Sequence, residues 1–298
     1  MSLTVSTPTQ TRLLTTVARV KTEIGISAST DDDFLDSCVR HATDMVEKYC
    51  NRIFHRQTYS ENSPSFGGPH FLLRQAPVAG TLGTVSYDGD TITDVELIDK
   101  AKGLLYREAG FGWTAQSYAG LEYREFWMEN GRPISGSEEH LWTFAYTAGF
   151  IVPPQDRLSV ATISADATTD SFSDSASLFP ALLKSGDIIE TSGFSNSANN
   201  GRFLVTGTPT VSNIVVDGAL TTETAAAGRT LRVANLPGDV ERGAIEIVKS
   251  LYAKRSVDGS ISSRSAGPLS ISYFSQMAAA AGMPLTAAAL LKPWIRRV

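Results

Sequence analysis

A long stretch in the middle of the chain differs in composition from everything around it. Between Ser159 and Val233 there is no Trp, Tyr, His, Met or Cys, although each of these residues occurs elsewhere in the chain. The stretch contains short runs, SVATIS, GDIIETS, RFLVTGT, NIVVDG and TLRV, which are separated by segments rich in Gly, Ser, Asn and Ala. Runs of this length between turn signals predict β-strands. We therefore expect a small all-β unit of barrel-like or sandwich-like form.

The residues on either side of this stretch predict one interrupted domain. An aromatic strand ends at Phe150, Pro153 and Pro154 follow, and a helical pattern begins after Leu236. A domain can be inserted into such a connection because loop-closure entropy grows only slowly with loop length. We expect residues 1–152 and 236–298 to form one discontinuous domain, and residues 153–235 to form an inserted β domain.

The outer domain combines helical and extended patterns. Apolar residues at helical spacing predict helices over residues 8–24, 30–51, 240–255 and 285–295. Between residues 53 and 150 short runs alternate with turns, and the sequence YDGD at Tyr87–Asp90 is typical of a hairpin. The expected fold class is α+β, with a mainly helical core and β-hairpins, interrupted by the small all-β insert.

Charge is distributed unevenly along the chain. The whole chain carries −5, but from Leu251 to Val298 six basic residues accompany one acidic residue, a net charge of +5 that leaves −10 for the remainder. Nucleic-acid binding requires a basic surface, so the acidic body argues against it. The basic end of the chain indicates a partner of its own. No window approaches the ~18 apolar residues of a membrane span, and the N-terminal residues lack the layout of a signal peptide, which favours the cytoplasm.

The sequence lacks the motifs of common enzymes. It contains no P-loop, no H-E-x-x-H and no dinucleotide-binding glycine pattern. Cys38, His41, Cys50 and His55 are candidate zinc ligands, but Cys50 lies three helical turns beyond Cys38, too far for one tetrahedral site. The same separation excludes a disulfide, so we interpret both cysteines as buried small side chains. We expect no enzymatic activity, no metal and no cofactor.

Several motifs recur in a fixed order. The strand YTAGF at Tyr146–Phe150 precedes LPGDVERGA at Leu236–Ala244, and that helix ends with Tyr252 and Arg255. Further matches are an early helical pattern, A-x-x-x-I-E-x-Y-x-x-R, and a late S-x-G-x-x-S-x-S-Y pattern. They comprise Ala42, Val46, Glu47, Tyr49, Arg52, Ser265, Gly267, Ser270, Ser272 and Tyr273. This order resembles the head–tail connector (adaptor) proteins of long-tailed bacteriophages, prophages and gene-transfer particles. The insert is similar to small β modules of phage neck and tail proteins.

The resemblance implies a structural role in the virion neck. Connector proteins of this kind form a ring, commonly twelve-fold, that docks under the portal and extends the DNA channel toward the tail. The implied partners are the portal protein, a stopper or tail-completion protein, and other copies of the chain. Genomic DNA would pass through the lumen without sequence-specific binding. The protein would be made in the cytoplasm of the bacterial host.

The basic end of the chain is the predicted portal-docking segment. It combines apolar and cationic side chains, which suits an acidic partner surface. Its members are Leu290, Leu291, Lys292, Trp294, Ile295, Arg296 and Arg297. We expect that removing residues after Thr286 abolishes portal binding while the fold survives, and that the insert projects outward from the ring.

Two alternative functions stay open at this point. The chain could be a different neck protein, such as a stopper or tail-completion protein. It could also bind carbohydrate through the β insert, although sugar platforms usually need Trp or Tyr and the insert has neither. Trp113, Trp127 and Trp142 lie outside the insert, and we interpret them as core or interface residues.

Overall fold

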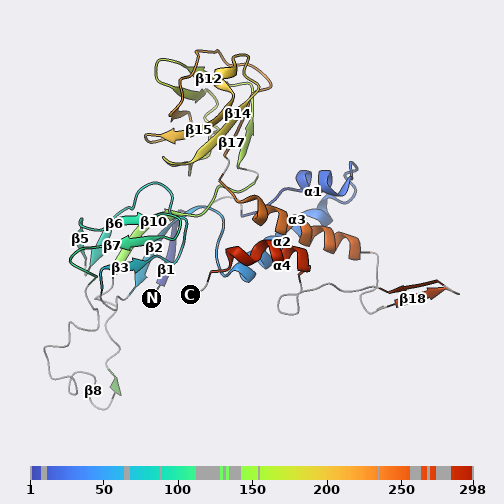
Figure 1. Cartoon of the computed structure of the whole chain (residues 1–298), viewed down its shortest axis with the longest axis horizontal. Coiled ribbons are helices and arrows are strands. Elements are labelled where there is room, and N and C mark those ends of the chain that lie inside the picture. The colour runs from blue at the N-terminus through green and yellow to red at the C-terminus, as the bar shows by residue number, and fades with distance from the viewer. Residues whose placement is uncertain are drawn as a thin grey trace.

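The computed structural model describes residues 2–7, 12–63, 68–87, 89–111, 128–129, 132–133, 142–153, 155–233, 235–255, 263–266, 269–272 and 283–296. The larger part of these residues forms a helical bundle, a β-sheet body and an all-β unit, which meet near the middle of the molecule (Figure 1).

The helical bundle brings together segments from both ends of the chain. It contains α1 (Val17–Ile24), α2 (Asp32–Cys50), α3 (Gly238–Lys254) and α4 (Leu285–Leu291), and α4 continues into the 3-10 turn η4 (Lys292–Trp294). The helix α3 packs against both α2 and α4. The buried residues between them include Leu35, Val39, Ala42, Val46, Val240, Ala244, Ile247, Val248 and Leu291.

The β-sheet body is built from two antiparallel sheets. The five-stranded sheet has the order β1 (Ser2–Thr7), β2 (Gln57–Ser63), β10 (Trp142–Ala148), β4 (Val85–Tyr87) and β5 (Asp90–Ile92). The three-stranded sheet has the order β3 (His70–Leu72), β7 (Leu104–Tyr106) and β6 (Glu96–Asp99). Aromatic rings pack between the sheets, with the ring centroids of Phe71 and Phe144 4.5 Å apart. Trp142 is 1% exposed and is a core residue, whereas Trp113 and Trp127 lie outside the described residues.

The all-β unit lies between β10 and α3 in the chain. Its seven strands pair antiparallel in the order β11 (Arg157–Ser159), β17 (Thr230–Val233), β14 (Ile188–Ser192), β15 (Gly201–Thr206), β16 (Asn213–Val216), β13 (Ser171–Asp174) and β12 (Ile163–Asp166). It has a separate core that includes Ile163, Phe172, Ile189, Ile214 and Leu231. A short 3-10 turn, η3 (Ser197–Asn199), precedes β15. The remaining elements are two hairpins, β8 (Met128–Glu129) with β9 (Arg132–Pro133), and β18 (Ser263–Ala266) with β19 (Leu269–Ser272).

The structure corrects the expectation of a mainly helical outer domain. The fold is α+β, but the run of hairpins between residues 57 and 148 forms the two sheets of the β-sheet body around an aromatic core of their own. The helix expected over residues 8–24 is also too long. Among the described residues 12–24, only Val17–Ile24 is helical. Thr16 has an extended backbone and caps α1 by accepting a hydrogen bond from the Arg19 N–H.

Residues on the two sides of the all-β unit share one core. Phe150 and Val152, just before the unit, belong to the same buried cluster as Val240 and Ala244 after it. Ile151 instead joins the core of the all-β unit, so the chain crosses between the two cores at this point. We propose that residues 153–235 are an inserted domain and that residues 1–152 and 236–298 form the domain that carries it. Below, "the insert" denotes residues 153–235.

Candidate assembly surfaces

A buried ion pair joins the insert to the β-sheet body. Arg56, which precedes β2, donates from Nη1 to Asp187 Oδ2 at 2.5 Å and from Nη2 to Asp187 Oδ1 at 2.7 Å. The same guanidinium donates to the carbonyl oxygens of Leu182 and Gly149, each at 3.0 Å. Asn235 completes the junction by donating to Asp187 Oδ1 at 3.2 Å. Such bidentate pairing fixes both the distance and the relative orientation of the guanidinium and the carboxylate.

A second junction joins the insert to the helical bundle. Arg19 on α1 donates to both carboxylate oxygens of Asp156, at 3.1 and 2.9 Å, and to Glu241 on α3 at 2.6 Å. Burial alone would lower the pKa of Arg19, but the bonds to Glu241 and Asp156 outweigh it and the pKa is raised. Asp156 also binds the insert's last strand, because Val233 N–H donates to its carbonyl at 2.6 Å. The insert is therefore held at two separate points.

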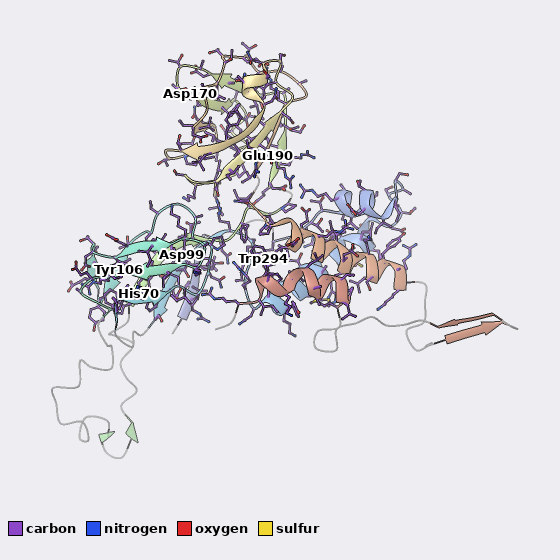
Figure 2. The ribbon with its side chains drawn as sticks, in the orientation of Figure 1. His70, Asp99, Tyr106, Asp170, Glu190 and Trp294 are labelled. Carbon is purple, nitrogen blue, oxygen red and sulfur yellow. The ribbon has the colours of Figure 1, made fainter. Side chains whose placement is uncertain are left out.

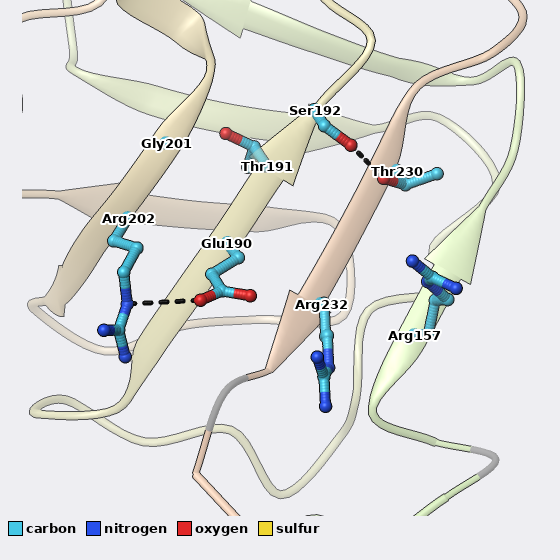
Figure 3. Close-up of a pocket in the computed structure, with 8 residues that line it drawn as sticks. All are labelled: Arg157, Glu190, Thr191, Ser192, Gly201, Arg202, Thr230 and Arg232. Carbon is cyan, nitrogen blue, oxygen red and sulfur yellow. Dashed lines mark hydrogen bonds and ion pairs between the residues drawn. The ribbon is translucent and has the colours of Figure 1, made fainter.

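One face of the insert presents a row of four charged side chains, three arginines and one glutamate, across four neighbouring strands. Cross-strand pairing places Arg157 opposite Arg232, Arg232 opposite Glu190, and Glu190 opposite Arg202. These side chains border a groove of about 270 Å³ together with Thr230 and the other residues drawn in Figure 3. We call this surface the arginine face and define it by Arg157, Arg202 and Arg232.

An acidic hollow lies on the β-sheet body, far from the arginine face in the fold. Its volume is about 410 Å³, and Asp94, Glu96, Tyr106 and Glu108 line it. Arg107 donates to Asp94 at 2.8 Å, and this bond holds the pKa of Asp94 below its usual value. Glu96 and Glu108 form no ion pair with any residue that the structure describes. Tyr106 marks the position of the hollow in Figure 2.

The predicted portal-docking segment is partly used by the fold itself. Leu291 is fully buried in the bundle, where its side chain lies directly over Gly243 of α3. Trp294 is half-buried and packs edge-on against Phe150, with ring centroids 6.4 Å apart. Arg296 donates from its backbone N–H to Cys50 O at 2.9 Å, and its guanidinium donates to Leu73 O.

These contacts correct two expectations for the C-terminal segment. Leu291 cannot contact a partner while it is buried in the bundle, and Arg296 is occupied by intramolecular bonds. The fold is therefore not expected to survive removal of the residues after Thr286. Lys292 is exposed and Leu290 and Ile295 are half-buried, so these three can still face a partner. Arg297 lies outside the described residues.

Residues of the recurring motifs hold the bundle together. Glu47 accepts hydrogen bonds from Phe54 N–H at 3.2 Å and from Arg12 at 2.9 Å, and it lies 3.1 Å from His55 Nδ1. Burial would raise the pKa of Glu47, but His55, Arg12 and the Phe54 N–H together lower it. The motif carboxylate thus ties the end of α2 to the chain that enters β2.

The Tyr252 and Arg255 pair has a comparable role at the other end of the bundle. The Tyr252 hydroxyl donates to Asp31 Oδ2 at 2.7 Å, and Arg255 Nη1 lies 2.6 Å from Asp31 Oδ1. The bond from Arg255, followed by that from Tyr252, lowers the pKa of Asp31. Since Asp31 is the N-cap position of α2, these residues clamp the end of α3 to the start of α2.

The candidate zinc ligands do not converge. Cys38 and Cys50 are free thiols buried in the bundle, and His55 binds Glu47 instead. Within the described part of the chain, no group of three or more His, Cys, Asp or Glu side chains could hold a metal ion. Among the same residues, no helix combines the length and apolar character needed to cross a membrane.

Sequence reasoning missed the arginine face and both junctions. The alternation in RLS, IIETS, GRF and TLRV could show that Arg157, Glu190 and Arg232 point away from the core of the insert. The order and register of strands far apart in the sequence could not be read from that pattern. The Arg56–Asp187 pair gives no local signal, because its partners lie in two different domains.

Comparison with known proteins identifies one family. Residues 14–72 match the family described as "Phage gp6-like head-tail connector protein". No curated protein matches the chain. A solved chain described as "Neck of empty GTA particle computed with C6 symmetry" aligns with 100% of this chain and 97% of its own length, at 14% identity and a TM-score of 0.45. This match over residues 14–72 confirms the resemblance to head–tail connector proteins that the sequence predicted.

Proposed function

We propose that the chain is a subunit of a ring that docks beneath the portal and extends the DNA channel toward the tail. The family match over residues 14–72 carries this proposal. In the structure these residues supply α1, α2, β2 and β3, which belong to both the helical bundle and the β-sheet body. The matched segment therefore forms part of the central body of the subunit and is not a peripheral module.

The charge of the subunit supports a role as a passive conduit. With −10 over residues 1–250 and −5 overall, the body carries an excess of negative charge. A channel wall of this sign would repel phosphates and allow the duplex to slide. Closed rings are formed by two different complementary faces on each subunit and need no catalytic residue. The proposed ring has twelve copies, with the portal above and a stopper or tail-completion protein below.

Portal docking is proposed for the exposed side of the C-terminal segment. Lys292 is exposed beside Leu290 and Ile295, whereas Leu291 and Trp294 anchor the same segment in the bundle. This arrangement supplies one cation and two accessible apolar side chains on a firmly held support. We propose that it meets an acidic surface of the portal, and that the insert projects outward from the ring.

The experiment is a mass measurement by light scattering, on the chain alone and mixed with the portal ring of the same particle. Wild-type protein is expected to add a full ring to the portal, visible as an extra annular layer in negative-stain images. The double substitution Lys292→Glu with Ile295→Glu should abolish the added mass. Lys48→Glu, an exposed charge change on α2, is the matched control and should bind normally. Equal binding by all three proteins contradicts the docking proposal, and no added mass with wild type contradicts the connector proposal.

The carbohydrate alternative receives no support from the insert. The arginine face exposes cationic and hydroxyl-bearing side chains, and Phe203 and Phe194, the large rings near it, pack with the insert's core. We also propose that the protein has a structural role and turns over no substrate. As a connector of this family, it would be made in the cytoplasm of the bacterial host.

A further inference from the structure

The arginine face carries positive charge that the described carboxylates of the subunit neutralise only in part. Arg157 and Arg232 stand directly opposite each other on β11 and β17, an arrangement that is unfavourable for like charges. Arg157 forms no ion pair with any described residue. Arg232 lies 3.8 Å from Asp156, and that carboxylate is already bound at closer range by Arg19. Only Arg202 has a partner of its own, Glu190 at 3.2 Å.

This surface contrasts with the rest of the insert. Between Ser159 and Val233 seven acidic residues accompany four basic ones, so the insert is acidic as a whole. The arginines are nevertheless gathered on one sheet face, next to two exposed apolar side chains, Ile188 and Leu204, which are 37% and 40% exposed. Arginine beside exposed apolar surface is typical of protein interfaces. The face therefore fits a protein partner that supplies carboxylates.

The subunit contains a surface with the complementary character. In the acidic hollow, Glu96 and Glu108 are exposed and lack ion pairs within the described residues, and Tyr106 lies directly opposite Glu96 across the strands. The hollow belongs to the β-sheet body and the arginine face belongs to the insert. Figure 2 shows Tyr106 and Glu190, which mark the two surfaces, well apart and on different bodies. The two patches of one subunit are thus placed to meet other copies.

We propose that the arginine face of one subunit docks on the acidic hollow of a second copy of this chain. The inference rests on the proposed ring, because two different complementary patches are what a head-to-tail contact between successive subunits requires. The Arg56–Asp187 and Arg19–Asp156 junctions serve this contact by holding the arginine face in a fixed orientation. An insert that projects outward is compatible with it, since only one of its faces is used.

Cross-linking between two full-length variants tests the contact. One variant carries Arg202→Cys and the other Glu96→Cys, and they are mixed with a short bis-maleimide reagent. The native thiols give little background, because Cys38 and Cys50 are buried and burial raises the pKa of Cys50 to about 12. The matched control replaces Glu96→Cys by Asp44→Cys, an exposed acidic position on α2. We expect about tenfold more cross-linked dimer from the Arg202–Glu96 combination than from the control.

Charge exchange makes the test specific. Adding Arg157→Glu and Arg232→Glu to the Arg202→Cys variant should reduce its cross-linking to the control level. Adding Glu108→Lys to the Glu96→Cys variant should then restore part of the yield, which a merely misfolded insert would not allow. Raising the salt concentration should weaken the wild-type contact, because exposed charges are screened. Equal yields from the Arg202–Glu96 and control combinations overturn the proposal.

Two further results distinguish this subunit contact from DNA binding by the same face and from the proposed portal docking. If a short DNA duplex binds the wild-type chain at low salt, and Arg157→Glu with Arg232→Glu abolishes that binding without any selective cross-link, the face binds phosphates and the proposal is wrong. The portal measurement is independent of the cross-link. A portal complex without selective cross-linking rejects only the subunit contact, and selective cross-linking without portal binding rejects only the connector role.

Discussion

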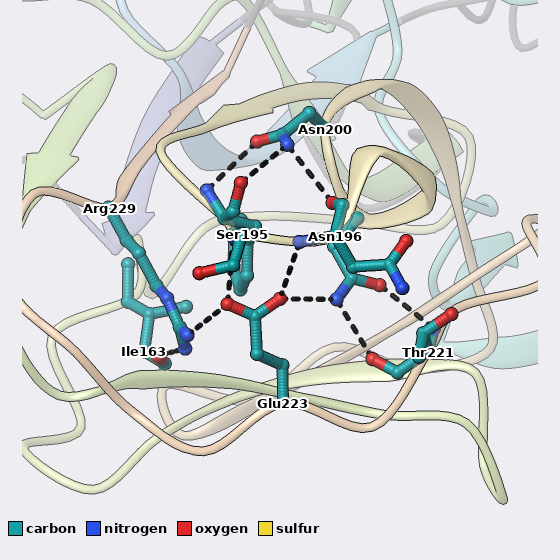
Figure 4. A network of polar contacts seen from close by, with 9 residues as sticks. Ile163, Ser195, Asn196, Asn200, Thr221, Glu223 and Arg229 are labelled. Atoms are coloured by element: carbon teal, nitrogen blue, oxygen red, sulfur yellow. Dashed lines mark hydrogen bonds and ion pairs between the residues drawn. The ribbon is translucent and has the colours of Figure 1, made fainter.

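At the scale of single residues, carboxylates that accept several hydrogen bonds organise the irregular parts of the chain. Glu223 is the clearest case, since it accepts hydrogen bonds from the backbone N–H groups of Ser195 and Asn196 and from the Asn199 side chain. It also pairs with Arg229 at 2.5 Å, and Arg229 in turn donates to Ile163 O (Figure 4). One side chain thus fastens the loop after β14 to the loop before β17.

The first prediction concerns the acid stability of the insert. The Ser195 N–H, with Asn196, Asn199 and Arg229, lowers the pKa of Glu223 to about 2, against an opposing effect of burial. Because the folded-state pKa lies below the unfolded value, this stabilisation is present above roughly pH 4.5 and is lost as the pH falls toward 2. Glu223→Gln should lower the melting temperature at pH 7 and flatten its decline in acid.

Thermal unfolding followed between pH 7 and pH 2 measures this effect. The control is Glu190→Gln, which alters a partly exposed carboxylate on the arginine face. It should retain the wild-type pH profile. A Glu223→Gln protein whose melting temperature declines in acid as steeply as that of the wild type would contradict the assignment.

At the scale of elements, the two junctions fix how the insert is attached. Arg56 and Asp187 are 4% and 9% exposed at their side chains, so removing either partner leaves a buried charge unpaired. We expect Arg56→Met or Asp187→Leu alone to reduce the free energy of unfolding by about 3–5 kcal/mol. The double substitution should cost clearly less than the sum, because it removes both charges together.

Urea unfolding of the two single variants and the double variant completes this cycle. The solvent-exposed ion pair between Arg40 and Asp36 on α2 offers a matched comparison. Replacing either residue by an apolar one should reduce the free energy of unfolding by less than about 1 kcal/mol. If the Arg56 and Asp187 losses simply add, the pair does not act as one buried unit.

The C-terminal segment gives a second prediction at this scale. Leu291 is fully buried over Gly243, so Leu291→Ala should cost about 2–5 kcal/mol through lost burial and the cavity that remains. Lys292→Ala, one residue further along, should change stability by less than about 0.5 kcal/mol because Lys292 is exposed. Denaturant unfolding distinguishes the two, and similar losses would show that the segment is not packed as described.

Local patterns predicted the elements better than their partners. The apolar stripe of α2 and four of the five runs of the insert gave correct element types, because helical and strand periodicities are set by neighbouring residues. The run SVATIS instead covers the end of β11, a turn and the start of β12. β13 was missed because its sequence SFSD offers a single large apolar residue, Phe172. β1 was also missed, since a strand of Ser and Thr around Leu3 and Val5 is fixed by pairing with β2 over fifty residues away.

The candidate surfaces, like the strand partners, could not be predicted from local sequence alone. The basic end of the chain was visible in the composition. Composition could not show that Leu291 is buried in the bundle and that Arg296 is bound to the carbonyl of Leu73. That distinction depends on α4 packing against α3, a contact between segments separated by a long interval. The arginine face likewise requires the register of β11, β17, β14 and β15, which no local pattern contains.

At the scale of the whole molecule, separate cores suggest separable parts. The bundle, the β-sheet body and the insert each have a hydrophobic core of their own. The insert begins after Val152 and ends at Asn235. Val152 and Leu236 both pack against the bundle, so the two ends of the insertion are held by the same core. Among the described residues, the core cluster of the bundle includes no side chain of the insert.

The last prediction follows from this arrangement. Residues 153–235 are replaced by a short Gly-Ser linker, and Arg56→Leu and Ile151→Thr are added because both side chains lose their partners in the insert. The shortened chain should fold cooperatively with the helical circular dichroism of α1–α4, since loop closure between the anchored ends costs little. It should bind the portal ring through Lys292 and its neighbours, and with Glu96→Cys it should still cross-link to a full-length Arg202→Cys subunit, because it retains the acidic hollow. A shortened chain that is unfolded, while the linker variant carrying an unrelated small β domain is folded, would mean that the outer domain needs a bulky insert to hold its two segments together.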